Sequence, residues 1–530
     1  MKKIVISGVK MPVTHSNSEI FDTAEKIAKG RKLCVSNPVI YKKSLDARKK
    51  SDIHYVYSVV FDAKNINESS LDSQIKLFDE QEYFDVASHR KEENRRKTVV
   101  VVGSGPCGLF AAYILAGCGV RTVLIERGSN VDARQKKVEK FWNTGILDPN
   151  TNIQFGEGGA GTFSDGKLNT RIGSPLQSFV LQTFAEFGAP KEILYQAKPH
   201  IGTDLLRDCV KNLREKIKSF GGEVLFDTCL TDIKIKDGRV CGAQLNGSAY
   251  IECDAVVLAP GHSSRDTYEM LAKKGVAMEQ KPFAAGVRIE HSREFINRLQ
   301  YGSFKDIEKL PTADYRLAYN GESRSCYSFC MCPGGTVVNA SSEDGHLCIN
   351  GMSEHSRMAE NSNSALVVTV KPEDFEGNSP LAGVEFQRKY ERLAYNMLSG
   401  KGPVQLAKDF IKNRVSDSFD GVKPSFTGET GFADLRGALP AFITDTLVEG
   451  LSTFERKMKG FCDGGSILTG VEMRTSAPLR IKRNDNFESI SHSGLFPAGE
   501  GAGYAGGIMS AAVDGIRVAD RILEMWQMKN

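Results

Sequence analysis

The chain has 530 residues, of which 41% are hydrophobic and 25% are charged, and its net charge is +4. A chain of this length is expected to form about two to four domains, and the composition is that of a soluble globular protein. So small a net charge does not by itself indicate a nucleic-acid or membrane partner. The twelve cysteines form no regular framework, so we expect reduced thiols and a cytoplasmic protein.

Residues 1–90 are expected to form a small N-terminal α+β module followed by a linker. IVISGV predicts a strand, SNSEIFDTAEKIAKG predicts a helix with a capping box of Ser16 and Glu19, and PVIYKKSLDAR and DIHYVYSVVFDA predict two further strands. This βαββ order is compatible with a ferredoxin-like module. Residues 65–97 look like a polar connection. We interpret the basic runs YKKSLDARKK and RKEENRRK as solvated surface, with nucleic-acid contact as the alternative.

Two apolar stretches could be mistaken for membrane or targeting segments. MKKIVISGVKMPV is short, is interrupted by lysine and has no small-residue cleavage site, so we expect a strand there and no signal peptide. Residues 98–120 carry no charge and are long enough to span a bilayer. Because GSGPCG interrupts this stretch after a few β-branched residues, we predict a strand, a tight turn and a helix.

The stretch VVVVGSGPCGLFAAYILAGCGVRTVLIER has the pattern of a dinucleotide-binding unit. Gly103, Gly105 and Gly108 form G-x-G-x-x-G directly after a strand, and Glu126 ends the next strand 23 residues after Gly103. The first glycine makes the turn, the second lets the backbone approach a pyrophosphate, and the third lets helix and strand pack closely. The helix N-terminus attracts phosphate, and the Glu126 carboxylate can accept hydrogen bonds from both ribose hydroxyls. The pattern favours FAD or NAD over NADP.

Three later segments have the composition to hold the rest of an FAD molecule. GEGGAGTFSDGKL (156–168) offers bare backbone and the hydroxyls of Thr162 and Ser164, and CDAVVLAPGHSSRD runs from a strand into the turn Ala259-Pro260-Gly261. The third segment, GLFPAGEGAGYAGGIMSAAVDGI (494–516), holds a second glycine-rich loop and a helix.

In this third segment each residue type has a mechanical reason. Glu500 is placed to accept a hydrogen bond from a ribityl hydroxyl, and Gly506 and Gly507 let the backbone pass close to a flavin. The helix from Ile508 would direct its N-terminus at the N1–C2=O edge, where negative charge gathers on reduction. One long cofactor therefore accounts for two glycine-rich loops that lie far apart in the sequence.

At this point the sequence resembles the uncharacterised bacterial FAD-dependent dehydrogenases, a family within the glutathione-reductase-like flavoproteins. The stretches that carry the resemblance are YKKSLDARKKSDIHYVYSV, VVGSGPCGLFAA, GEGGAGTFSDGKLNTRI, PHIGTD, CMCPGGTVVNASSEDG, NGMSEHSR, TSAPLRI and FPAGEGAGYAGGIMSAAVDGI. The resemblance implies bound FAD and an α/β fold, in which a Rossmann-like FAD-binding domain is built from discontinuous segments and an α+β substrate domain is inserted. We expect the FAD-binding domain at 98–280 and 471–530, and the substrate domain at 281–470.

The motifs and the resemblance together imply one set of cofactor-binding residues. They are Gly103, Gly105, Pro106, Cys107, Gly108, Glu126, Arg127, Arg134, Gly161, Thr162, Ser164, Leu230, Ala259, Pro260, Gly261, Gly499, Glu500, Gly507 and Ile508. In this set, Arg127, Arg134 and Leu230 are expected near the adenosine.

Candidates for acid–base or redox chemistry are few. His200 lies in KPHIGTD, where Thr203 and Asp204 are expected to cap the next helix, and the alternative for His200 is a packing role. His262 follows the Ala-Pro-Gly turn and is interpreted as holding it. Tyr504 lies between the two glycine clusters, where it could face the flavin or anchor the loop. Arg288, Arg474 and Arg480 would suit an anionic substrate.

The cysteines do not form a recognisable cofactor site. Cys326, Cys330, Cys332 and Cys348 depart from ferredoxin spacing, so we interpret them as buried and inert, with a redox-active thiol such as Cys332 as the alternative. No C-x-x-C occurs, which argues against a disulfide reductase of the pyridine-nucleotide type. No metal-binding pattern and no second G-x-G-x-x-G with its helix and acid occurs.

The function predicted from these observations is an FAD-dependent oxidoreductase that transfers hydride between flavin N5 and an unidentified small molecule. NADH or NADPH is expected, if used, only as a transient electron donor. The alternatives are a flavin-dependent RNA-modifying protein, a flavin-stabilised binding or sensor protein without turnover, and an NAD enzyme without flavin. We expect no nucleic-acid or membrane partner, and the sequence does not determine the oligomeric state.

Overall fold

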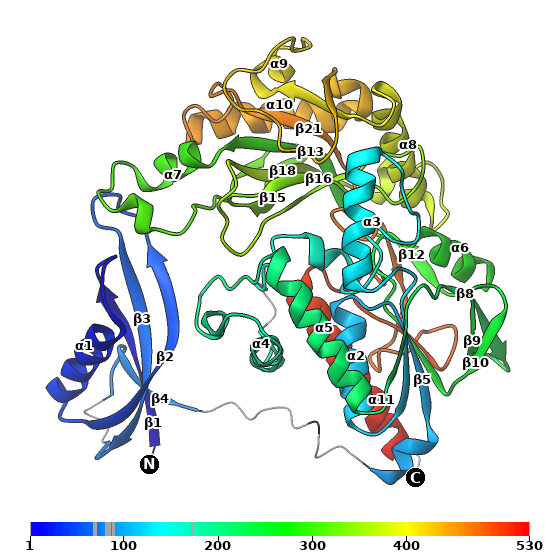
Figure 1. Cartoon of the computed structure of the whole chain (residues 1–530), viewed down its shortest axis with the longest axis horizontal. Coiled ribbons are helices and arrows are strands. Elements are labelled where there is room, and N and C mark those ends of the chain that lie inside the picture. The colour runs from blue at the N-terminus through cyan, green and yellow to red at the C-terminus, as the bar shows by residue number, and fades with distance from the viewer. Residues whose placement is uncertain (1, 67–70, 80–85, 87–90, 171–172, 529–530) are drawn as a thin grey trace.

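The computed structural model describes the whole chain except residues 1, 67–70, 80–85, 87–90, 171–172 and 529–530. Figure 1 shows three parts: an N-terminal module, a domain around a parallel sheet, and a domain around an antiparallel sheet that lies across the top of the view. We call the last two the parallel-sheet domain and the antiparallel-sheet domain.

The N-terminal module is a four-stranded antiparallel sheet with one helix. Its elements are β1 (Lys2–Met11), α1 (Asn17–Gly30), β2 (Cys34–Asp46), β3 (His54–Lys64) and β4 (Ile75–Phe78). The strand order is β2-β3-β1-β4, and α1 begins with the predicted capping box. The structure adds β4, which lies in the stretch expected as a polar connection and buries Ile75. Other parts of that stretch lie outside the described residues, and the ferredoxin-like classification stays a prediction.

The module is attached to both of the other parts. In β2, the backbone of Lys43 exchanges hydrogen bonds with Tyr195 O (2.7 Å) and Ala197 N (2.8 Å) in the parallel-sheet domain. Ile53, just before β3, belongs to the hydrophobic core of the antiparallel-sheet domain. The first strands of the chain are therefore docked on the rest of the protein.

The parallel-sheet domain contains the predicted strand–turn–helix units. Its five-stranded sheet has the order β23-β11-β5-β6-β7, with all neighbours parallel. The strands are β5 (Thr98–Val102), β6 (Arg121–Ile125), β7 (Glu223–Leu225), β11 (Ala255–Leu258) and β23 (Leu495–Pro497). The last strand comes from the far end of the chain, so the predicted α/β sheet of discontinuous segments is present. The carboxyl ends of parallel strands meet at one edge, which is where ligands bind in such sheets.

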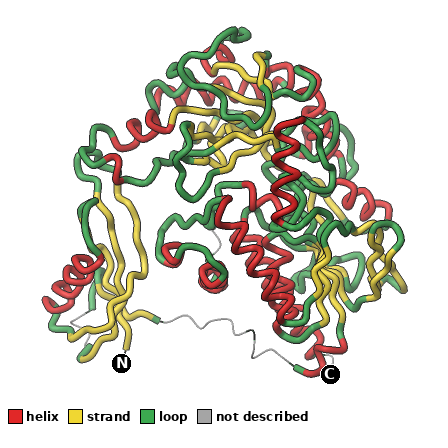
Figure 2. The backbone as a smooth tube through the Cα atoms, viewed as in Figure 1, coloured by secondary structure: helices red, strands yellow, loops and turns green. Residues whose placement is uncertain are grey.

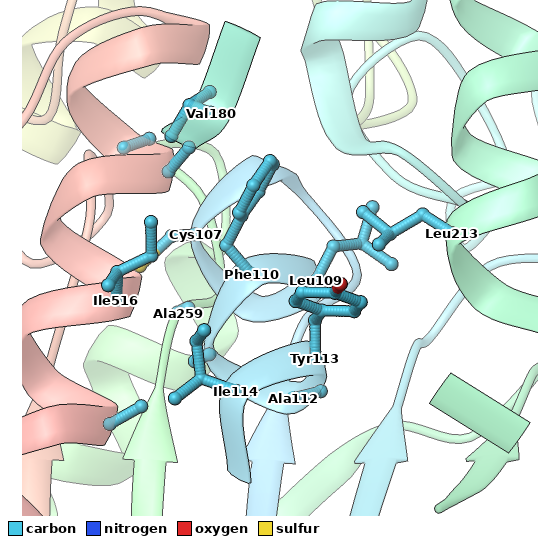
Figure 3. Packing of buried hydrophobic residues seen from close by; sticks show 14 of the residues in the cluster. Cys107, Leu109, Phe110, Ala112, Tyr113, Ile114, Val180, Leu213, Ala259 and Ile516 are labelled. Atoms are coloured by element: carbon cyan, nitrogen blue, oxygen red, sulfur yellow. The ribbon is translucent and has the colours of Figure 1, made fainter. Parts of the chain in front are cut away.

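Helices cover one face of this sheet, and a small second sheet together with one helix covers the other. The first face carries α2 (Pro106–Gly117), α4 (Leu176–Glu186), α5 (Thr203–Ser219) and α11 (Ile508–Gln527), the second face carries α6 (Arg265–Lys273), and α3 (Val131–Thr144) packs in a separate cluster. The second sheet is β8 (Leu230–Lys236), β9 (Arg239–Leu245) and β10 (Ala249–Glu252). Figure 3 shows Phe110, Tyr113 and Ile114 of α2 packed among side chains from α4, α5 and α11. The uncharged stretch 98–120 is thus a buried strand, turn and helix, and within the described ranges no helix is long and apolar enough to cross a membrane.

The antiparallel-sheet domain has a seven-stranded sheet of order β14-β15-β18-β13-β21-β19-β20. These strands are β13 (Phe283–Ser292), β14 (Ala318–Asn320), β15 (Ser325–Cys332), β18 (Asn361–Val370), β19 (Gly402–Leu406), β20 (Thr430–Phe432) and β21 (Ile467–Glu472). The ribbon of β16 (Thr336–Asn339) and β17 (Ile349–Met352) and the helices α7 (Arg293–Tyr301), α8 (Ala382–Met397), α9 (Ala407–Ile411) and α10 (Ala441–Lys457) complete it. The chain enters and leaves through two paired strands, β12 (Met278–Gln280) and β22 (Leu479–Ile481). The path can be followed in Figure 2.

Short 3-10 helices connect several of these elements. They are η3 (Glu92–Arg96), η4 (Gly159–Phe163), η5 (Lys191–Leu194), η6 (Ile307–Lys309), η7 (Pro372–Asp374) and η8 (Leu435–Ala438).

Candidate functional site

The first glycine-rich loop joins β5 to α2 and leaves no room for side chains at two positions. A Cβ at Gly103 would lie 2.3 Å from Ala259 O, and a Cβ at Gly108 would lie 1.8 Å from Gly103 O. Gly103 also has a φ of 95°, which disfavours other residues. The α2 N-terminus begins with Gly105 as N-cap and Pro106, without a side-chain cap. Its free N–H groups can therefore receive an anion such as a pyrophosphate.

The second glycine-rich segment, 156–163, lies directly against this loop. Gly158 N donates to Ser104 O (2.9 Å), and a Cβ at Gly159 would lie 3.0 Å from the Cα of Gly105. A Cβ at Gly161 would lie 3.1 Å from Cγ1 of Ile508, the first residue of α11. Three segments that are distant in the sequence therefore meet around one backbone-lined space.

The third segment follows β23 and is held by two residues that sequence reasoning missed. Asp514 of α11 accepts hydrogen bonds from Gly499 N (2.8 Å) and from both terminal nitrogens of Arg483 (2.7 and 3.0 Å). Arg483 also donates to Pro497 O (2.8 Å). The available signal was an aspartate among the apolar positions of a buried helix. This pair fixes Gly499, whose Cβ would lie 2.9 Å from that of Cys107.

The N-terminus of α11 faces open space. Its N-cap is Gly507, with a φ of 107° and no side-chain cap, and a Cβ there would meet nothing within 4 Å. The predicted turn at Ala259-Pro260-Gly261 lies beside the same segment, because Tyr268 Oη donates to both Gly501 O (2.8 Å) and Gly261 O (3.2 Å). The turn and both glycine-rich loops thus lie at one edge of the parallel sheet.

Glu500 has a carboxylate that is free to accept a ligand hydroxyl. No hydrogen bond to this carboxylate is present among the residues that the structure describes, and a Cβ at Gly506 would lie 3.8 Å from its Oε1. Burial raises the pKa of Glu500 to about 7, although the Lys281 ammonium acts to lower it. Burial, and then the charge of Glu500, raise the pKa of Tyr268, so the two groups interact. An acceptor without a partner beside exposed glycines fits the expected ribityl chain.

The state of Glu500 leads to a prediction about pH. Because its pKa is raised, the carboxyl keeps its proton up to about pH 7 and is a strong acceptor only above that value. We expect FAD to bind about tenfold more weakly at pH 6 than at pH 8. Fluorescence titration of FAD into the flavin-free full-length chain measures this step, and Glu500→Gln should remove it. A pH-independent wild-type affinity would contradict the prediction.

The adenosine end of the expected site is arranged around Glu126, which accepts four hydrogen bonds from the protein. Arg127 pairs with Asp266 (2.8 Å) and lies over the Phe155 ring, 4.3 Å from its centroid. Leu230 is buried at the start of β8. Thr228 N donates to Glu126 O (2.8 Å), so the segment before Leu230 lies beside Glu126. Cofactor contacts of Arg127 and Leu230 stay predictions.

Arg134 does not have the role expected for it. Its side chain is 0% exposed, and it donates to the carbonyls of residues 152, 153, 156, 157 and 159 at 2.7–3.2 Å and to Thr162 Oγ1 at 2.6 Å. The guanidinium therefore shapes the second glycine-rich segment from behind. Because the carbonyls it binds lie about 20 residues further on, a local motif could not show this.

The hydroxyls of Thr162 and Ser164 are also used within the protein. Thr162 Oγ1 donates to Gly159 O (2.7 Å), and Ser164 Oγ donates to Gly161 O (2.7 Å) and accepts from Gly166 N (3.1 Å). They hold turns of the segment, and their contacts with the cofactor stay predictions.

His200 packs on a second histidine at the junction of the two domains. Its ring is stacked on His355 with centroids 5.1 Å apart, and its Nε2–H donates to His355 O (3.1 Å). Burial, and then the Arg357 guanidinium, lower the pKa of His200 to about 4. Thr203 and Asp204 do not cap α5, whose N-cap is Gly202. Their side chains bind Thr162 O and His355 N instead.

Tyr504 and Cys332 are engaged in structural contacts. Tyr504 Oη donates to Ile481 O (3.0 Å) and accepts from Arg483 N (3.0 Å), and the Arg483 guanidinium lies 3.7 Å from the ring centroid. This tyrosine is the anchor of its loop. Cys332 is buried, and its burial raises the pKa of the thiol, so it stays protonated at neutral pH.

His262 Nδ1 lies 2.9 Å from Ser263 Oγ, and burial lowers the pKa of His262 to about 3.

The four clustered cysteines do not form one site. Cys326 packs against Gly450 of α10, where a Cβ would lie 2.7 Å from its Sγ, whereas Cys332 Sγ lies 3.9 Å from Arg288 Nη1. All twelve cysteines are free thiols. Within the described ranges no group of three or more His, Cys, Asp or Glu side chains could hold a metal ion.

Two of the three arginines proposed for an anionic substrate are neutralised by buried carboxylates. Arg288 pairs with Glu472 through two hydrogen bonds (2.8 and 3.1 Å) and donates to Asn363 Oδ1 (2.6 Å). Arg474 pairs with Glu391 (2.7 and 2.8 Å). Arg480 reaches Glu279 only at 3.4 Å, so its contact with an anion stays a prediction. The sequence could not show these pairs, because the partners lie on different elements.

The antiparallel-sheet domain closes over the second glycine-rich segment. Arg357 pairs with Asp165, Lys167 donates to Met331 O, and Thr203 N donates to Ser353 O (3.0 Å). The candidate site therefore lies at the parallel-sheet edge beneath the antiparallel-sheet domain, and Figure 1 shows α5 below β15 and β18.

Comparison with known proteins identifies the family. Residues 282–475 match the family model described as FAD-dependent protein, C-terminal domain-like, and residues 96–137 match the FAD binding domain. An uncharacterized protein of Clostridium beijerinckii is 52% identical over 501 residues, which span 93% of each chain. The chain belongs to this family of FAD-dependent proteins.

Three further similarities of this FAD-dependent protein are shorter or looser. An L-amino-acid oxidase of Bungarus fasciatus is 35% identical over 89 residues, 16% of this chain and 17% of the oxidase. A thiamine thiazole synthase of Aeropyrum pernix is 25% identical over 205 residues, 36% of this chain and 63% of the synthase. A geranylgeranyl bacteriochlorophyll reductase-like protein of Thermoplasma acidophilum has a TM-score of 0.36 at 14% identity, covering 82% of this chain and 80% of that chain. A superposition this loose carries no argument about function.

The residues at the sheet edge fit the cofactor of the family. The glycine cradle, two helix N-termini without side-chain caps, and the free carboxylate of Glu500 match the pyrophosphate and ribityl parts of FAD. Together with the two family models, they show that the FAD-dependent protein binds FAD.

Proposed function

We propose that the protein is an FAD-dependent oxidoreductase of the glutathione-reductase-like group. When bound, FAD supplies hydride transfer at its N5 atom. The observation that carries the proposal is the meeting of the glycine-rich segments around Gly105, Gly161 and Gly507 under a second domain. The similarity to L-amino-acid oxidases supports oxidoreductase chemistry over a short stretch. The partner in the hydride transfer is proposed to be a small molecule that enters between the two domains.

The protein's own residues would bind the cofactor, exclude water and handle one proton. With Tyr504 and Cys332 engaged elsewhere, His200 is the remaining candidate for the proton. Its Nε2–H is fixed on His355 O, which leaves Nδ1 as the acceptor of the neutral ring. We therefore propose His200 as the proton acceptor, through Nδ1, and its pKa of about 4 makes it a weak base that is neutral at physiological pH. The free cysteines and the clostridial relative support a bacterial cytoplasmic protein.

An absorption spectrum tests the proposed function. The purified full-length protein is expected to show oxidised-flavin bands, and these should bleach when NADH or NADPH is added without oxygen. This result would establish a nicotinamide-fed flavoenzyme and justify a screen of oxidised acceptors. Bands that persist with both nucleotides, and with candidate reduced substrates, would favour a binding or sensor protein without turnover. Bleaching dependent on an RNA would favour the RNA-modifying alternative.

A further inference from the structure

The carboxylate of Glu126 is fully occupied by donors of the protein itself. Oε2 accepts from Ser104 N (2.9 Å) and Ser104 Oγ (2.8 Å), and Oε1 accepts from Gly128 N (3.0 Å) and Gly156 N (2.9 Å). Glu126 is 5% exposed and Ser104 is 0% exposed. The two oxygens of a carboxylate offer about four acceptor sites. Two ribose hydroxyls therefore cannot simply be added to this carboxylate.

Three of the four donors are fixed by the fold. The N–H groups of Ser104, Gly128 and Gly156 belong to the backbone of tightly packed loops, and a Cβ at Gly128 would lie 2.6 Å from the Cα of Gly156. These loops have no room to separate. The fourth donor is the Ser104 hydroxyl, which leaves the carboxylate by rotation about a single bond.

We propose that Ser104 determines the affinity and ribose selectivity of the nucleotide site, because its hydroxyl must leave Glu126 before a ribose hydroxyl can donate there. The exchange replaces one hydrogen bond to the carboxylate by another, so the ribose hydroxyl contributes little net free energy to binding. The displaced hydroxyl also remains buried and must find another acceptor, which costs further free energy. Ser104 is thus a positioning residue that acts through Glu126. One ribose hydroxyl replaces the Ser104 hydroxyl as a donor to the Glu126 carboxylate, whereas the sequence suggested that two ribose hydroxyls bind there.

The native chain provides the first test. ADP, 2′-deoxy-ADP and 3′-deoxy-ADP are titrated into the flavin-free full-length protein by calorimetry, since ADP is the adenosine half of FAD. We expect the three dissociation constants to agree within about threefold, because the gain of a ribose hydrogen bond is offset by the loss of the serine one. A tenfold or larger preference of the native chain for ADP over both deoxy nucleotides would overturn the proposal.

Variants provide the second test. Ser104→Ala should bind ADP and FAD about 2- to 10-fold more tightly and prefer ADP over one deoxy nucleotide by a similar factor. Ser104→Thr, which keeps the hydroxyl, should behave as the native chain. Ser466→Ala removes a fully buried serine hydroxyl in the antiparallel-sheet domain. It should change neither the nucleotide affinity nor the preference for ADP over the deoxy nucleotides. Weaker or unchanged binding in Ser104→Ala, with the selectivity unchanged, would contradict the exchange. If that variant does not fold, the native-chain comparison still decides.

Discussion

Glu391→Gln is expected to lower the free energy of unfolding by about 3–5 kcal/mol, because it removes the charged partner of the buried Arg474 and leaves the buried Arg265 with Glu343 alone. Glu391 lies on α8 and is 0% exposed. It pairs with Arg265 of α6 (2.8 and 3.0 Å) and with Arg474, which follows β21 (2.7 and 2.8 Å). Burial acts to raise the pKa of Glu391, but the guanidinium groups outweigh it and hold the pKa at about 2.

The ion pairs of Glu391 should also make the stability of the protein fall at low pH. A carboxyl whose pKa is lowered on folding contributes stability above its unfolded pKa and loses that contribution as the pH falls towards its folded pKa. The contribution of Glu391 should therefore be complete at neutral pH and disappear between about pH 4.5 and pH 2. Because Arg265 belongs to the parallel-sheet domain and Glu391 to the antiparallel-sheet domain, the variant should also loosen the junction between the two domains.

Urea unfolding of the full-length protein measures this effect, and limited proteolysis reports on the domain junction. Glu376→Gln is the matched control, since Glu376 pairs with Lys389 (2.7 Å) on the surface with 86% of its side chain exposed. We expect the control to change stability by less than about 1 kcal/mol. A Glu391→Gln variant that unfolds at the same urea concentration as this control would refute the role of the buried network.

Gly108→Ala is expected to abolish most FAD binding while the domains still fold. The added Cβ would lie 1.8 Å from Gly103 O, which is backbone and cannot move aside as a side chain can. Relieving such a clash typically costs about 1–3 kcal/mol, and if the loop pays this cost in its bound form the affinity falls about 5- to 150-fold. The variant should therefore purify with little flavin.

The ratio of flavin absorbance to protein absorbance measures this loss, with far-UV circular dichroism to confirm folding. Gly30→Ala is the control, because a Cβ at Gly30 would meet nothing within 4 Å and this glycine ends α1 in the N-terminal module. The control should retain its flavin. A Gly108→Ala protein that keeps full flavin content would show that the loop can shift without harm to the site.

The parts of the site that the sequence by itself determined are those set by backbone stereochemistry over a few neighbouring residues. The pyrophosphate loop is an example, because its strand, its three glycines (Gly103, Gly105 and Gly108) and the uncapped start of its helix are neighbours in the sequence. The second loop at Gly507 was recognisable for the same reason, and FAD followed because a single loop could not bind so long a cofactor. Glu126 could be predicted from the same local pattern, because it ends the next strand. The four hydrogen-bond donors that occupy its carboxylate could not be predicted in this way.

Only the tertiary structure decided which polar side chains are available for chemistry. Arg134, Arg474 and Tyr504 have the residue types of a binding site, yet each is engaged by groups from other segments: Arg134 by the carbonyls of 152–159, Arg474 by Glu391 and Tyr504 by Arg483. A buried charge or hydroxyl must find a partner, and the fold brings that partner from any distance along the chain. The glycine loops could therefore be read locally, whereas the partners of the buried polar groups became visible only once the chain had been folded.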